Sequence, residues 1–95
     1  MSTNRTYLAF DLGAESGRAL IGRLQSDVLS VEEVHRFPNE PVTYNGELHW
    51  DVARLWLEMQ KALALVSSID GGKLDGIGVD TWGVDYALLG EHGRA

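Results

Sequence analysis

The chain is short, acidic and free of cysteine. Its 95 residues, 44% of them apolar, suffice for one modest core, because chains of this size bury only about 60–65% of their unfolded surface. Eight lysines and arginines against fourteen acidic residues give a formal charge of −6, which disfavours nucleic acid and anionic membranes as partners. The lack of cysteine excludes disulfides and thiolate metal sites. The apolar run before Asp11 is too short for a signal peptide or a membrane span, so we expect a cytoplasmic protein.

The first forty residues have the pattern of three sequential antiparallel strands. Apolar and β-prone stretches alternate with polar turns that contain glycine, serine and aspartate. The strands are expected at residues 6–10, 18–24 and 28–37, with turns at 11–17 and 25–27. Pro38 and Pro41 close the third strand, because proline removes a donor from the strand ladder. Residues 38–49 are then expected to be loop.

A helical repeat begins at Asp51, the expected N-cap, and ends before the pair Gly71-Gly72. Apolar residues recur there every three or four positions, at Val52, Leu55, Trp56, Met59, Leu63 and Val66. We expect this stripe, Trp56 included, to face the core and Glu58 to lie elsewhere on the helix. Two short strands are expected after the helix, at residues 74–80 and 84–89, which gives the order βββαββ.

The turn between the first two strands has the composition of a phosphate-binding hairpin. It consists of Asp11-Leu12-Gly13-Ala14-Glu15-Ser16-Gly17-Arg18. Glycines let successive backbone N–H groups approach an anion, and Ser16 adds a hydroxyl donor. Arg18 can reach a phosphate oxygen, and Asp11 can hold Mg²⁺ through water. An ordinary tight hairpin has the same composition. Neither G-x-x-x-x-G-K-[ST] nor G-x-G-x-x-G is present, which excludes P-loop and Rossmann sites.

A second polar cluster, Gly76-Ile77-Gly78-Val79-Asp80-Thr81-Trp82-Gly83-Val84-Asp85, lies at the end of a later strand. Strand ends in α/β sheets are where ligands collect. Asp80 can hydrogen-bond sugar hydroxyls, Trp82 can cover an apolar sugar face, and Gly83 permits close approach of the backbone. A strand-turn-strand unit with a core tryptophan accounts for the same residues equally well.

Four segments, taken in order, carry a family resemblance. The run A-F-D-L-G-A-E-S-G-R at 9–18 resembles the first phosphate-binding hairpin of the actin, hexokinase and heat-shock chaperone superfamily. His35-Arg36-Phe37, Trp50-Asp51 and G-I-G-V-D-T-W-G-V-D at 76–85 resemble the corresponding stretches of rhamnulokinases, a branch of the FGGY carbohydrate kinases. The resemblance spans residues 7–89.

The resemblance implies a ribonuclease-H-like α/β fold, with residues 1–95 as the N-terminal part of the first kinase domain and the remainder of the same polypeptide as its partner. It implies an ATP-phosphate site made by Gly13, Ala14, Glu15, Ser16, Gly17 and Arg18. It also implies a sugar site at Gly83, to which we add Trp82 and Asp80, and Mg²⁺ near Asp11. Glu15 departs from the small residue frequent at this position, and a carboxylate beside a triphosphate is unfavourable unless it points outward or helps to hold the metal.

The implied reaction transfers the γ-phosphate of ATP to the 1-hydroxyl of L-rhamnulose. The aspartate that accepts the hydroxyl proton lies further along the chain in this family, so we expect a 95-residue piece to be inactive by itself. The alternatives are an FGGY kinase of xylulose, fuculose or glycerol, an actin-like nucleotide-binding protein, and a non-catalytic α/β module.

Overall fold

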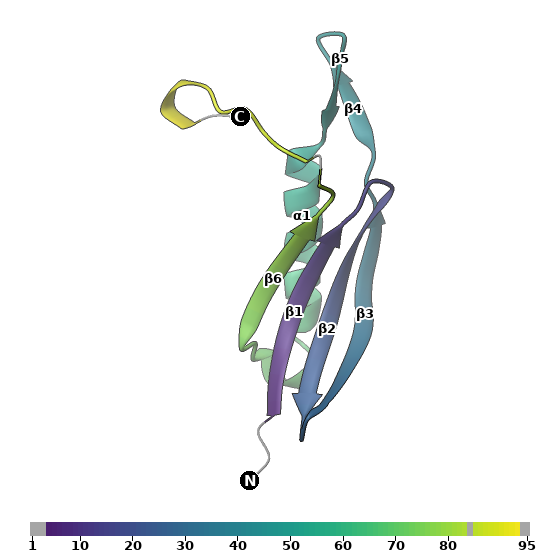
Figure 1. The fold of residues 1–95 in the computed structure, drawn as a ribbon, viewed down its shortest axis with the longest axis vertical. Coiled ribbons are helices and arrows are strands. Elements are labelled where there is room, and N and C mark those ends of the chain that lie inside the picture. Colours follow the sequence, from purple (N-terminus) through teal and green to yellow (C-terminus); the bar gives the residue numbers. More distant parts are fainter. Residues whose placement is uncertain (1–3, 84, 94–95) are drawn as a thin grey trace.

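The computed structural model describes residues 4–83 and 85–93, which form a twisted sheet backed by one helix (Figure 1). The strands of this sheet are β1 (Asn4–Leu12), β2 (Ser16–Gln25), β3 (Val28–Pro38) and β6 (Gly76–Thr81). Their order is β3-β2-β1-β6. The first three strands pair antiparallel, as expected, whereas β6 runs parallel to β1. Helix α1 (Val52–Val66) supplies the long crossover that a parallel pair requires.

The core lies between α1 and one face of the sheet. Alternate residues of β1 and β2 point toward the helix and are buried, because successive strand residues face opposite sides. These residues are Leu8, Phe10, Leu12, Ala19 and Ile21, joined by Phe37 of β3 and by Ala62 and Val66 of the helix. The helix begins where expected, since a carboxylate oxygen of Asp51 accepts a hydrogen bond from the backbone N–H of Arg54 at 3.1 Å.

The orientation of α1 differs from the expected one. Trp56 is 56% exposed, whereas Glu58 is only 3% exposed. The line of closest approach to the sheet runs through Glu58, Ala62 and Val66, and Met59 is partly buried beside it. The expectations that Trp56 lies in the core and that Glu58 lies away from it are therefore wrong. The helix can turn Glu58 inward because basic groups surround its carboxylate.

Residues 38–49 are not the loop that the prolines indicated. They contain most of a separate hairpin, β4 (Pro41–Tyr44) paired antiparallel with β5 (Glu47–Trp50). Asn45 and Gly46 form its turn with φ of 51° and 77°. Two consecutive residues in the left-handed backbone conformation give the turn the twist that two antiparallel strands need.

The prediction of a last strand at 84–89 is also wrong, because residues 85–89 have no strand structure. Residue 84 lies outside the described residues. A strand needs a neighbour, and β6 has no partner on its outer side within the described chain. Short 3₁₀ turns cover Asp70–Gly72 and Glu91–Gly93. In the described part of the chain, no helix has the length and apolar character needed to cross a membrane.

Candidate functional site

Both candidate clusters lie at the same end of the sheet. Because β1 and β6 are parallel, their carboxyl ends meet at one edge (Figure 1). Asp11 is the direct cross-strand neighbour of Asp80. Beyond the strands, the backbone N–H of Trp82 donates to the carbonyl of Leu12 at 3.1 Å. The structure thus brings the segment expected to bind phosphate within contact of the segment expected to bind sugar.

The phosphate hairpin is a short turn of residues 13–15 between β1 and β2. The N–H of Gly13 donates to the carbonyl of Ser16 at 3.0 Å and closes the turn. Ala14 and Glu15 are exposed at its tip. Arg36, to which the sequence analysis gave no ligand role, has a guanidinium nitrogen 3.4 Å from the Ser16 hydroxyl. The tip is therefore open to a ligand and has a second cation beside it.

Gly17 has a packing role that composition alone could not show. Its cross-strand neighbour in β3 is Phe37, which is 3% exposed. A Cβ at position 17 would lie 2.2 Å from the ring of Phe37. The aromatic ring covers the glycine at the start of β2 and thereby anchors the base of the hairpin.

Asp11 and Arg18 form an ion pair across β1 and β2. The distance from the Arg18 Nη2 to the Asp11 Oδ2 is 2.5 Å, and each side chain is 38% exposed. The hydrogen bond to Asp11, together with its charge, raises the pKa of Arg18 above its usual value. The guanidinium therefore stays charged at the foot of the hairpin.

The fit of these residues to Mg²⁺ rests on two carboxylates. Asp11 and Asp80 are paired across β1 and β6, and cross-strand partners share a face of the sheet. Within residues 4–83 and 85–93, no group of three or more histidines and carboxylates is placed to hold a metal ion. Two carboxylates suit a magnesium ion that keeps most of its waters, which is its usual mode of binding beside phosphates. The donor chemistry therefore fits.

A pocket of about 700 Å³ opens next to the strand ends. Its walls include Leu12 and Thr81 from the strands, His49 and Trp50 from β5, and Asp85 from the segment after β6. The hairpin that the sequence analysis missed thus forms one side of the candidate site.

A hydrogen bond holds the segment after β6 against β5, which lines the pocket. The Trp50 Nε1 donates to the Asp85 Oδ1 at 2.8 Å, and the Asp85 N–H donates to the Trp82 carbonyl at 2.9 Å. Trp82 is 49% exposed. Gly83 is exposed as well, and no atom lies within 4 Å of the place that a Cβ would take. Local packing among the described residues therefore gives no reason for glycine at position 83.

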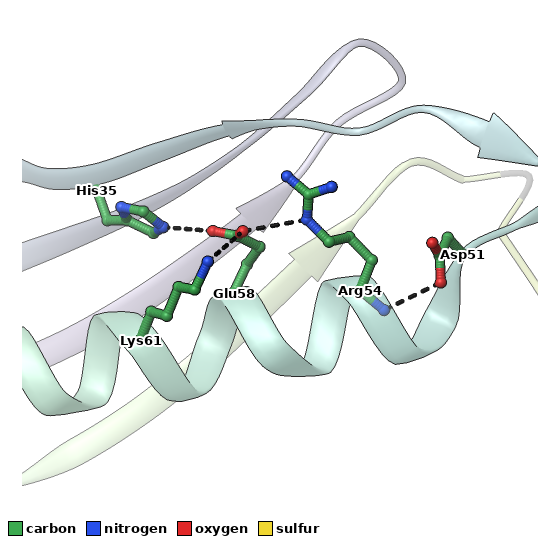
Figure 2. Close-up of polar contacts among 5 residues, drawn as sticks. All are labelled: His35, Asp51, Arg54, Glu58 and Lys61. Atoms are coloured by element: carbon green, nitrogen blue, oxygen red, sulfur yellow. Dashed lines mark hydrogen bonds and ion pairs between the residues drawn. The ribbon is translucent and has the colours of Figure 1, made fainter.

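A charge cluster around the buried Glu58 connects β3 to the helix. Figure 2 shows three basic side chains converging on Glu58. The His35 Nε2 lies 2.6 Å from its carboxylate, the Arg54 Nε 3.1 Å and the Lys61 Nζ 3.2 Å. The hydrogen bond from His35, helped by Lys61 and Arg54, lowers the pKa of Glu58 to about 2, against a desolvation that would raise it. The cluster holds α1 against β3.

Known proteins resemble this chain in sequence and in fold. No family model matches it. The rhamnulokinase of Bacteroides thetaiotaomicron is 40% identical over 90 residues, which are 95% of this chain. The rhamnulokinases of Mannheimia succiniciproducens and Enterococcus faecalis are each 45% identical, over 90% and 95% of it. The chain spans 18% of the length of each of these relatives.

Two solved structures of the Ppx/GppA protein from Aquifex aeolicus share the fold. They superpose with TM-scores of 0.62 and 0.56 over 83% of this chain, at 17% and 18% identity. The chain covers 27% and 26% of those structures. The likeness confirms the expected fold class, a portion of the ribonuclease-H-like α/β fold, although residues 85–89 do not form the last strand of the expected order. The expected resemblance is confirmed too: over about nine-tenths of its length, this chain is similar to rhamnulokinases at 40–45% identity.

Proposed function

We propose that the protein containing this chain transfers the γ-phosphate of ATP to L-rhamnulose, giving L-rhamnulose 1-phosphate. The observation that carries the proposal is the meeting of two segments at the carboxyl ends of β1 and β6. These are the hairpin at 11–18 and the turn that begins at Trp82, joined by the hydrogen bond to Leu12. Each resembles its counterpart in rhamnulokinases, and phosphoryl transfer requires the nucleotide and the acceptor hydroxyl to be side by side.

On the nucleotide side, the backbone N–H groups of the hairpin tip would bind phosphate oxygens, with the Ser16 hydroxyl as a further donor. The charged Arg18 would offset phosphate charge from the foot of the hairpin. Asp11 and Asp80 would hold Mg²⁺ through its waters, and the bound ion would supply further neutralisation of the phosphates. The exposed position of Glu15 keeps its carboxylate free to point away from the nucleotide.

On the sugar side, the pocket of about 700 Å³ is large enough for a monosaccharide, and it adjoins the segment of Asp80, Trp82 and Gly83, none of which lines it. The open space beside Gly83 allows a sugar to approach the backbone there. Trp82 offers a flat apolar surface, and Asp80 offers an acceptor for sugar hydroxyls. The group that takes the hydroxyl proton would come from the remainder of the polypeptide.

The test uses the full-length natural protein that contains this chain. ATP consumption is measured with L-rhamnulose, L-fuculose, D-xylulose and glycerol, for the wild type and for Gly83→Trp. We expect L-rhamnulose to give the highest kcat/KM. We expect Gly83→Trp to abolish turnover while ATP still binds, because an indole would fill the space left for the sugar.

Thr43→Trp is the matched control, since it adds the same side chain at an exposed position of β4. If another of the four sugars gives the highest kcat/KM, the proposed substrate is wrong and the proposed kinase activity stands. If no sugar stimulates ATP consumption, the kinase proposal fails.

A further inference from the structure

Asn39, which directly follows β3, joins that strand to the phosphate hairpin. Its side chain is almost fully buried, at 5% exposure. Its Nδ2 donates to the carbonyl of Gly13 at 2.7 Å, and its backbone N–H donates to the carbonyl of Glu15 at 3.0 Å. One residue thus holds the peptide group before Ala14 and the peptide group after Glu15, the two residues at the tip of the hairpin.

These two hydrogen bonds determine which way the hairpin donors point. In a trans peptide the C=O and the following N–H point in opposite directions. With the Gly13 carbonyl held toward Asn39, the N–H of Ala14 points away from it. The Glu15 carbonyl points toward Asn39 as well, so the N–H of Ser16 points toward β1, on the side where the Ser16 carbonyl accepts from Gly13. Asn39 therefore turns one backbone donor, the N–H of Ala14, away from β3, where an anion can accept from it.

The neighbouring contact keeps Asn39 in place. Two residues earlier in β3, the buried Phe37 lies over Gly17 and fixes the end of β3 against β2. Asn39 can therefore act as a rigid brace. An amide is needed for this, because an aspartate of the same shape would set a carboxylate oxygen against the Gly13 carbonyl with no hydrogen between them.

We propose that Asn39 is a positioning residue for nucleotide phosphates: it orients the N–H group of Ala14 toward the phosphate chain without touching the nucleotide. The inference rests on the proposed function only in so far as that function assigns phosphate binding to the hairpin. It adds a residue that lies outside the hairpin and outside the motif that indicated it.

The experiment compares the binding of ATP and of adenosine by calorimetry, using the full-length natural protein. The variants are Asn39→Asp and Asn39→Ala, with Asn4→Ala as the control at the opposite end of β1. Adenosine has no phosphates, so a misplaced hairpin weakens the binding of ATP and leaves the binding of adenosine unchanged. A general loss of structure weakens the binding of both ligands.

We expect Asn39→Asp to raise the Kd of ATP roughly tenfold and Asn39→Ala about threefold to fivefold, the size of effect that one hydrogen bond produces. The Kd of adenosine should stay within about twofold of the wild-type value. If Asn39→Asp does not fold, Asn39→Ala decides, because it adds no charge and keeps the backbone bond to Glu15.

Equal weakening of ATP and adenosine, or an unchanged Kd for ATP, would overturn the inference. If the wild type binds ATP but no sugar stimulates turnover, the sugar-kinase proposal fails, while the titration still decides the role of Asn39. If the wild type binds no ATP, both are wrong.

Discussion

Replacing Glu58 by glutamine removes the negative charge around which His35, Arg54 and Lys61 are arranged, while keeping the shape of the side chain. The ordinary pKa of 4.5 falls to about 2 in the folded chain, which corresponds to roughly 3 kcal/mol in favour of the ionised form. Arg54 and Lys61 are 47% and 54% exposed, so solvent screens their contribution to this free energy. We therefore expect Glu58→Gln to cost about 2 kcal/mol of unfolding free energy near neutral pH.

The pH dependence follows from the direction of the shift. Because the folded pKa of Glu58 lies below its unfolded value, the stabilisation is complete above about pH 5 and is lost as the pH falls toward 2. Urea unfolding of the natural protein, wild type against Glu58→Gln, should show a gap near pH 7 that narrows strongly near pH 3. The exposed Glu40→Gln is the control. A gap of the same size at both pH values, or none near neutrality, would refute this reasoning.

Two further substitutions test the packing and the pocket. Gly17→Ala should destabilise the protein by about 1–3 kcal/mol, because its methyl group would enter the ring of Phe37; urea unfolding measures this, and full stability would show that the ring moves aside at no cost. Trp50→Phe removes the hydrogen bond to Asp85 and should raise the KM for sugar about fivefold at an unchanged KM for ATP. Trp56→Phe, on the exposed side of α1, should change neither constant, and an equal effect of the two substitutions would exclude a specific role for the Trp50 bond.

The sequence was sufficient for the elements that carry strong local signals. Alternation predicted the first three strands, and Asp51 marked the start of α1. The hairpin β4–β5 was missed although Asn45-Gly46 is a strong turn signal, because Pro38 and Pro41 were given more weight. The rotation of α1 was beyond the reach of periodicity. Glu58 is buried because it meets His35 of β3, and such pairing depends on tertiary contacts.

The candidate site was predictable in its two motifs and not in its supports. The D-L-G-A-E-S-G-R and D-T-W-G segments stood out by composition and resemblance, and the structure brings them together, although their ligand roles stay predictions. Asn39 had no local signal, and the resemblance of the segments that contain Arg36, Trp50 and Asp85 did not show which hydrogen bonds these residues make. Each acts across strands distant in the chain, so only the fold shows what it contacts.

The most direct test of the proposed kinase activity is the identity of the phosphorylated product. The natural protein is incubated with ATP, Mg²⁺ and L-rhamnulose, and the product is examined by phosphorus NMR. We expect a new phosphate ester whose phosphorus couples to the two protons of a CH₂ group, as in a 1-phosphate. Release of inorganic phosphate without a sugar ester, or no consumption of ATP, would contradict the proposed kinase activity.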